Sequence, residues 1–194
     1  MRRMRIYFLL LALVSSLQIN VQAHELQASR ATLVLRDNQH LAITFYIDYP
    51  AVLHQAIAPH MLFHEFALQH SAMPQPIFAA QLLAAQRKLQ AGTRLVLRSG
   101  KPAPLELWAW PDATATQKAL QQRAMAAVVG AKDHAHAPPA EIRAEAKSTK
   151  STKSGDFATV TLQLPAEFKQ TLVVFYQPKQ AWVEPGKALA GIRF

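Results

Sequence analysis

The sequence predicts an α+β domain in which an antiparallel sheet or open β-sandwich carries helical insertions packed on one face. Stretches in which apolar and polar residues alternate, as in half-buried strands, occur near both ends of the chain and in its middle. Between them lie longer segments with the apolar period of amphipathic helices. Turns that contain proline, glycine or asparagine separate the two kinds of segment.

The start of the chain has the composition of a secretory signal peptide. Three arginines form a basic n-region, residues 6–14 form an apolar h-region, and small residues precede an expected cleavage between Ala23 and His24. An uncleaved anchor is the weaker alternative, because the apolar stretch is shorter than the roughly 20 residues of a spanning helix. We therefore expect residues 1–23 to be removed. Residues 24–194 then form a single exported domain without a transmembrane segment.

Turn residues and periodicity predict the order of the elements. Asp48 and Pro50 mark a helix start, because an aspartate side chain can cap a first turn and proline is tolerated there. Pro59 interrupts the helix-biased residues 51–70, so two short helices are expected there. In chain order, we expect strands at residues 26–36 and 41–47, two helices within 51–70, a helix at 77–90, strands at 93–98 and 105–110, a helix at 112–129, and strands at 141–147, 157–164, 171–176 and 182–183.

Several of these segments can also be placed in the fold. Residues 93–98 and 105–110 flank a loop with glycine and proline, and they are expected to pair with each other. Residues 171–176 form a nearly continuous apolar run, which suits a buried central strand. Residues 131–156, with Pro-Pro and repeated Ser-Thr-Lys, predict a flexible loop that the short strand at 141–147 interrupts.

Trp108 and Trp110 are two residues apart, which places them on the same face of a strand. Such a pair can stack on a sugar ring, or it can close a sheet face against the core. We expect the packing role, because large aromatic side chains contribute most to cores and are ordinarily buried in them.

Composition narrows the functional classes. The chain has no cysteine, which excludes disulfides, thiolate metal ligands and cysteine nucleophiles. Its formal net charge of +9 favours solubility and also suits an anionic surface. No basic stripe interleaved with aromatic residues is present, so nucleic acid is not an expected partner. Neither a Gly-x-Ser-x-Gly elbow nor a phosphate-binding glycine loop is found, and we predict that the protein is not an enzyme.

Histidines supply the candidate metal ligands. His60 and His64 are four apart in a helix-biased segment, so both imidazoles would share one helix face and could chelate a transition metal. A polar helix face with incidental histidines is the alternative. The other histidines near this segment or in the expected loop are His54, His70, His134 and His136.

His24 becomes a third candidate ligand once cleavage makes it the first residue of the mature chain. Its free α-amino group and one ring nitrogen can close a chelate around Cu(II), with a second histidine completing the site. This arrangement resembles the copper site of CopC-type and polysaccharide-monooxygenase proteins. That resemblance is carried by His24 alone, and it implies copper binding.

The mature start His24-Glu25-Leu26, followed by an apolar strand and a turn, resembles the extracytoplasmic leader domain of HupE/UreJ-type nickel/cobalt transporters. The resemblance implies a domain that works outside the cytoplasmic membrane. That family carries its transport in membrane helices, which this sequence does not show, so transport itself is not implied.

The residues therefore predict an exported, periplasmic or secreted domain with a non-enzymatic binding or accessory role. Its expected partner is a component of the envelope or a membrane protein. The alternative is a periplasmic protein that binds or delivers copper, nickel or zinc through His24 or through the pair His60 and His64. Tight stoichiometric binding of metal by the mature protein would distinguish the alternative from the first hypothesis.

Overall fold

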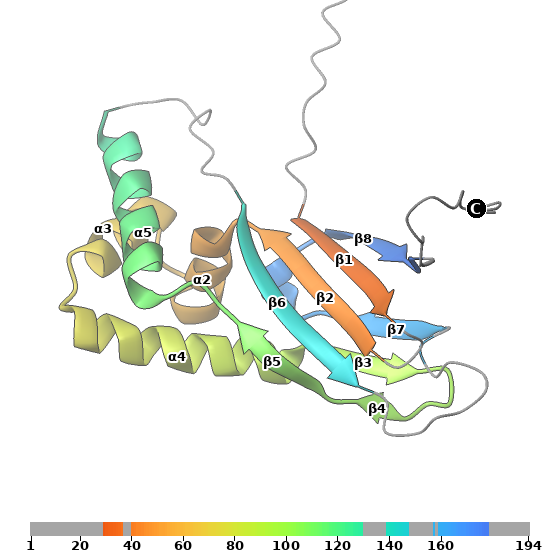
Figure 1. Cartoon of the computed structure of the whole chain (residues 1–194). Coiled ribbons are helices and arrows are strands. Elements are labelled where there is room, and N and C mark those ends of the chain that lie inside the picture. The colour runs from red at the N-terminus through yellow and green to blue at the C-terminus, as the bar shows by residue number, and fades with distance from the viewer. Residues whose placement is uncertain (1–28, 37–39, 130–138, 148–156, 158, 179–194) are drawn as a thin grey trace, which may run out of the picture.

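The computed structural model describes residues 29–36, 40–129, 139–147, 157 and 159–178 (Figure 1). Within these residues the chain is an α+β protein, as predicted. The helices are α2 (Tyr49–Ile57), α3 (Phe63–Ser71), α4 (Gln75–Gly92), α5 (Ala113–Val128) and the short 3₁₀ helix η1 (Ala166–Phe168). The strands are β1 (Ser29–Arg36), β2 (His40–Ile47), β3 (Arg94–Leu97), β4 (Pro102–Ala103), β5 (Leu105–Ala109), β6 (Ala140–Lys147), β7 (Val160–Gln163) and β8 (Thr171–Tyr176).

The strands form two sheets. The larger sheet has the order β5-β6-β2-β1-β8, and the smaller one has the order β4-β3-β7. All of the pairings are antiparallel except that of β8 with β1, which is parallel. In Figure 1 the smaller sheet lies behind the larger one, while α2, α3 and α5 gather beside one end of the larger sheet.

The core lies against one face of the larger sheet. Along β1, β2 and β6, every second residue is buried while its neighbours are half-buried or exposed, because successive side chains of a strand point to opposite faces. Burying each large aliphatic side chain contributes about 2 kcal/mol. The inward side chains are Ala31, Leu33, Leu35, Leu41, Ile43, Phe45, Ile47, Ile142, Ala144 and Ala146.

The helices lie within about two residues of the bounds that the sequence predicts. The Asp48 carboxylate accepts a hydrogen bond from the backbone N–H of Ala51 (3.4 Å) at the start of α2. The Asp112 carboxylate does the same for Ala115 (2.7 Å) at the start of α5. The turn around Pro59 separates α2 from α3. No helix in the described part of the chain is both long enough and apolar enough to cross a membrane.

Gly92 ends α4, and its lack of a side chain is required by packing. A Cβ atom at this position would lie 2.9 Å from the Cβ of Pro165, which precedes η1. Glycine therefore allows the end of α4 to approach the segment that leads into the last described strand.

The predicted pairing of residues 93–98 with 105–110 is wrong. β3 pairs with β4 and β7 in the smaller sheet, whereas β5 pairs with β6 in the larger one. A tight turn with Gly100 at φ 78° joins β3 to β4. Pro104 follows β4 directly and has no N–H to continue the ladder, so the chain leaves the smaller sheet there.

Two further predictions about position need correction. Residues 171–176 were expected to form a buried central strand, but β8 lies at the edge of the larger sheet. The short strand expected at residues 141–147, inside a loop, is β6. It lies in the interior of the larger sheet, between β2 and β5. The remainder of that loop, the leader at residues 1–23 and the strand expected around Trp182 lie outside the described residues.

Candidate functional site

The structure does not place His60 and His64 on one helix face. His60 lies in the turn between α2 and α3, and His64 is the second residue of α3, so the spacing argument for a chelating pair is wrong. Both side chains are exposed. Within the described residues, no group of three or more histidine, aspartate or glutamate side chains is arranged to hold a metal ion. His24, His134 and His136 lie outside the described residues, and the amino-terminal copper site stays a prediction.

The two other histidines of this region are buried and serve the fold. A ring nitrogen of His54, Nε2, donates to the backbone carbonyl of Met61 (2.7 Å). The Nδ1 of His70 donates to the carbonyl of Phe66 (2.9 Å), one turn earlier in α3. Phe66 contacts both imidazoles, with ring centroids 5.2 Å from His54 and 4.1 Å from His70. These interactions join α2 to α3 and use ring nitrogens that a metal would need.

Trp108 and Trp110 pack against the protein, as expected. Their rings stack on each other with centroids 5.3 Å apart, and Trp108 also stacks on Phe45 (6.1 Å). Trp110 contacts the ring of Tyr49 (5.9 Å). Leu107, between the two tryptophans, has a φ of 51° at an irregularity of β5, where the register shifts between Glu106 and Ala109. Because core aromatics contact the tryptophan rings, we assign the pair a packing role and not a sugar-binding role.

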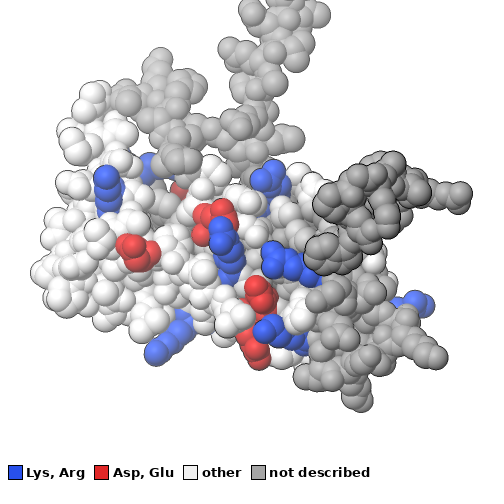
Figure 2. Space-filling view, viewed as in Figure 1, with Lys and Arg blue, Asp and Glu red and all other residues white. Residues whose placement is uncertain are grey.

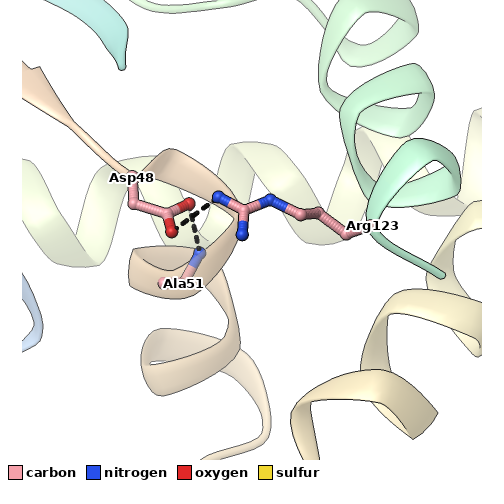
Figure 3. Close-up of polar contacts among 3 residues, drawn as sticks. All are labelled: Asp48, Ala51 and Arg123. Carbon is pink, nitrogen blue, oxygen red and sulfur yellow. Dashed lines mark hydrogen bonds and ion pairs between the residues drawn. The ribbon is translucent and has the colours of Figure 1, made fainter. Parts of the chain in front are cut away.

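Asp48 and Arg123 form the ion pair shown in Figure 3. The Asp48 carboxylate lies 2.8 Å from the Arg123 Nη2 while it also caps α2 through Ala51. Arg123 extends from α5, and its side chain is mostly buried. The pair therefore connects the end of β2 and the start of α2 to α5. The Asp48 carboxylate is thus engaged by two donors, the Arg123 guanidinium and the Ala51 N–H, in a tertiary contact.

Tyr49 should make the stability of the protein sensitive to alkaline pH. Burial raises the pKa of the Tyr49 hydroxyl well above its usual value, and the hydrogen bond that Gln86 donates (3.1 Å) offsets this only in part. A raised pKa in the folded state means that the stabilisation is complete below the unfolded pKa of about 10 and is lost as pH rises above it. Between the unfolded and folded pKa values, the free energy of unfolding should fall by about 1.4 kcal/mol per pH unit from this group.

Urea unfolding of the wild type and Tyr49→Phe between pH 8 and pH 11 measures this effect. At pH 8 the variant should be less stable by about 1 kcal/mol, because it lacks the hydrogen bond. Above pH 10 the wild type should lose stability more steeply than the variant. Parallel pH profiles for the two proteins would show that Tyr49 does not carry the alkaline sensitivity.

The most distinctive exposed feature is β8. In the described part of the chain, no strand pairs with its outer edge, so half of its backbone N–H and C=O groups point away from the sheet. Four of its six side chains are large, apolar and about half exposed: Leu172 (52%), Val173 (48%), Phe175 (43%) and Tyr176 (54%). β8 contains no charged residue and no proline. We refer to residues 171–176 with this outer edge as the β8 edge.

The opposite edge of the larger sheet, formed by β5, has features that hinder pairing with another strand. β5 is flanked by Pro104 and Pro111, contains Glu106 and is interrupted by the irregularity at Leu107. Prolines, charges and bulges prevent another strand from pairing with an edge. Pro178 follows β8 by two residues, but residues 171–176 themselves contain no proline, charge or register shift. This contrast with β5 singles out the β8 edge as the candidate site for contact with another polypeptide.

Basic residues lie around the β8 edge. Lys169, which is exposed and has a φ of 55°, comes just before β8. Arg30 and Arg36 are exposed on the neighbouring β1, and neither strand contains an acidic residue. Arg30 rests its guanidinium over the ring of Tyr46 (4.5 Å). Elsewhere on the face in Figure 2, acidic and basic side chains are interspersed.

Glu167 is the acidic residue nearest to β8 in the sequence, and it is already paired. Its carboxylate lies 2.9 Å from the Nζ of Lys88 on α4. The hydrogen bond from Lys88 lowers the pKa of the Glu167 carboxyl, so this group remains ionised and bound to its partner at neutral pH. The charge of Glu167 is thus balanced by Lys88, and the exposed charged residues described on β1 and directly before β8 are basic.

The sequence predicted the β8 residues as a strand but missed their position at the edge of the sheet. A nearly continuous apolar run is typical of a central strand, and only the sheet order reveals that this run lies at an edge. The sequence feature that distinguishes residues 171–176 is the absence of charged residues and proline.

Comparison of the chain with protein-family models, with curated proteins and with solved structures yields no match. The resemblances of the mature start to a HupE/UreJ-type leader domain and to an amino-terminal copper site therefore stay predictions.

Proposed function

We propose that the protein is an exported, non-enzymatic binding or accessory domain of the cell envelope, and that a partner protein adds a strand to the β8 edge. The observation that supports this is an uncharged edge strand with four half-exposed apolar side chains, opposite an edge that is protected. In strand addition, main-chain hydrogen bonds provide affinity and the alternating side chains provide specificity. The β8 edge offers both.

The reactive side chains in the described part of the fold favour a binding role over catalysis. The imidazoles of His54 and His70 are bonded to backbone carbonyls, and the Asp48 carboxylate is held by Ala51 and Arg123. Each of these groups is engaged in a hydrogen bond or ion pair within the fold. At the β8 edge, the exposed groups are backbone N–H and C=O groups and apolar side chains. Groups of these kinds bind an extended polypeptide.

Site-specific photo-cross-linking in a bacterial host tests the proposal. A photoreactive phenylalanine analogue would replace Phe175, and in a matched control it would replace Leu83, which lies on α4 and is also about half exposed (47%). We expect an adduct with an envelope protein from position 175 and not from position 83. Adding Val173→Lys should remove the adduct. The same cells, when fractionated, should hold the protein outside the cytoplasm with His24 as its first residue.

Two outcomes would contradict the proposal. Equal adduct patterns from positions 175 and 83 would show that the β8 edge is not a specific contact. Recovery of the uncleaved chain from the cytoplasm would overturn the exported location, whatever the cross-links show.

A further inference from the structure

The side chains of β8 limit the segment that the β8 edge can accept. The parallel register with β1 places Leu172, Val174 and Tyr176 beside the outward residues of β1. Val173 and Phe175 lie on the face of the sheet that carries the core, beside Ala31 and Leu33, but both side chains are about half exposed. An added strand therefore meets apolar neighbours on both of its faces. Pairs of β-branched and aromatic side chains are favourable across neighbouring strands, so the incoming segment should be apolar or β-branched on both faces.

Charge limits the residues that flank this segment. Lys169 lies near the start of β8, whereas the guanidinium of Arg30, the β1 partner of Leu172, rests over Tyr46 on β2, away from β8. Arg36 lies at the other end, two residues beyond the partner of Tyr176. Glu167, the acidic residue nearest to β8 in the sequence, is paired with Lys88. Exposed charges attract opposite charges over about 10 Å at 0.1 M salt, so acidic residues that flank an added strand would be attracted to these basic residues.

From these two observations we infer that the β8 edge accepts an extended partner segment that is apolar or β-branched on both faces and acidic at its flanks. This inference rests on the proposed function, and it identifies the chemistry of the partner strand. The segment would lie along Thr171–Tyr176, with its acidic flanks toward Lys169 at one end and toward Arg36 at the other.

The same charge argument disfavours two other occupants. A second copy of the chain would add its own Lys169 and Arg36 around an already basic edge. The residues that follow in this chain, 179–194, contain three basic residues and one acidic residue, so they are not charge-complementary either. Like charges brought together at an interface oppose association.

Peptide binding tests the inference directly. Fluorescently labelled peptides of alternating valine and threonine would carry two glutamates at each end, two lysines at each end, or the glutamates with a central proline. Fluorescence anisotropy with the full mature chain would give the affinity of each peptide at 0.05 M and 0.3 M NaCl. We expect the glutamate-flanked peptide to bind about tenfold more tightly than the lysine-flanked one at low salt, and the proline peptide not to bind. The preference should shrink at high salt.

Variants assign the binding to the β8 edge. Val173→Lys should weaken the glutamate-flanked peptide at least tenfold, whereas the matched substitution Leu83→Lys on α4 should leave its affinity unchanged. Lys169→Glu should reduce or reverse the preference for acidic flanks without removing the binding of the apolar core. Circular dichroism and thermal unfolding would confirm that each variant remains folded.

Several results would overturn the inference. These are equal affinities for acidic and basic flanks, no binding of any peptide, or a dimer in sedimentation equilibrium that Val173→Lys dissociates. Peptide binding that arises only after residues 179–194 are removed would identify those residues as the occupant instead. The cross-linking experiment separates the two proposals. An envelope adduct at position 175 with no preference for acidic flanks would leave the proposed function intact and remove only this inference.

Discussion

Replacing Phe45 with alanine is expected to lower the free energy of unfolding by about 3–5 kcal/mol. Phe45 lies on β2 and is fully buried. Its ring stacks on Trp108 of β5 and meets the edge of Phe168 in η1 (5.4 Å). Alanine would leave a cavity where the larger sheet, β5 and η1 meet, and neighbouring rings held by other contacts can fill it only in part.

Urea unfolding followed by tryptophan fluorescence measures this loss, and Trp108 reports on the same contact. The matched control is Thr44→Ala, one residue earlier on the outward face of β2, which should change stability by less than about 1 kcal/mol. A loss below about 1 kcal/mol for Phe45→Ala would mean that this ring does not join the elements as described.

Phe66→Ala should have an effect of similar size, about 3–5 kcal/mol. Phe66 is fully buried in α3, with the imidazoles of His54 and His70 against its ring. Its removal deletes apolar contacts and opens a space beside two polar rings. Since both imidazoles are held by backbone carbonyls, they cannot move into that space without breaking hydrogen bonds.

Thermal unfolding and the NMR signals of the two histidine rings test this prediction together. Leu68→Ala is the control, because Leu68 lies on the same helix but is 59% exposed. It should lower stability by no more than about 0.5 kcal/mol. If Phe66→Ala is equally mild, or if the ring signals of His54 and His70 do not shift, the packing of Phe66 between the histidines would be wrong.

Local signals predicted the helices well. The Asp48 and Asp112 carboxylates cap α2 and α5, and Pro59 divides residues 51–70 into two helices. Each of these features depends on residues within one turn of each other, so sequence spacing is sufficient. Runs of apolar and β-branched residues likewise predicted β1 and β2, because strand propensity depends on the local sequence.

Pairing and position in the sheets were predicted poorly. β3 and β5 are close in the sequence but belong to different sheets, and β6 pairs with β2 although helices and β-strands separate them in the chain. Which strands become neighbours depends on the packing of the whole domain. The exposure of β8 follows from the sheet order in the same way, so its apolar run was interpreted as interior.

The helix-face argument for His60 and His64 failed for a local reason. The spacing of His60 and His64 places them on one face only if a single helix contains both, and the break that Pro59 predicts falls beside His60. The proline that divided the helix therefore also argued against the pair. The β8 edge, in contrast, had no local signal beyond its lack of charge and proline.

The parallel pairing of β1 with β8 has a consequence for how the domain assembles. It joins the first and the last strands of the described part of the chain, so this pairing closes the longest loop in the larger sheet. Loop closure of this kind raises contact order and slows folding. Until β8 attaches, β1 is itself an open edge with the apolar residues Leu33, Val34 and Leu35 in its ladder. The newly made chain thus passes through a stage at which β1 can pair wrongly with a neighbouring molecule, and capture of β8 ends that exposure.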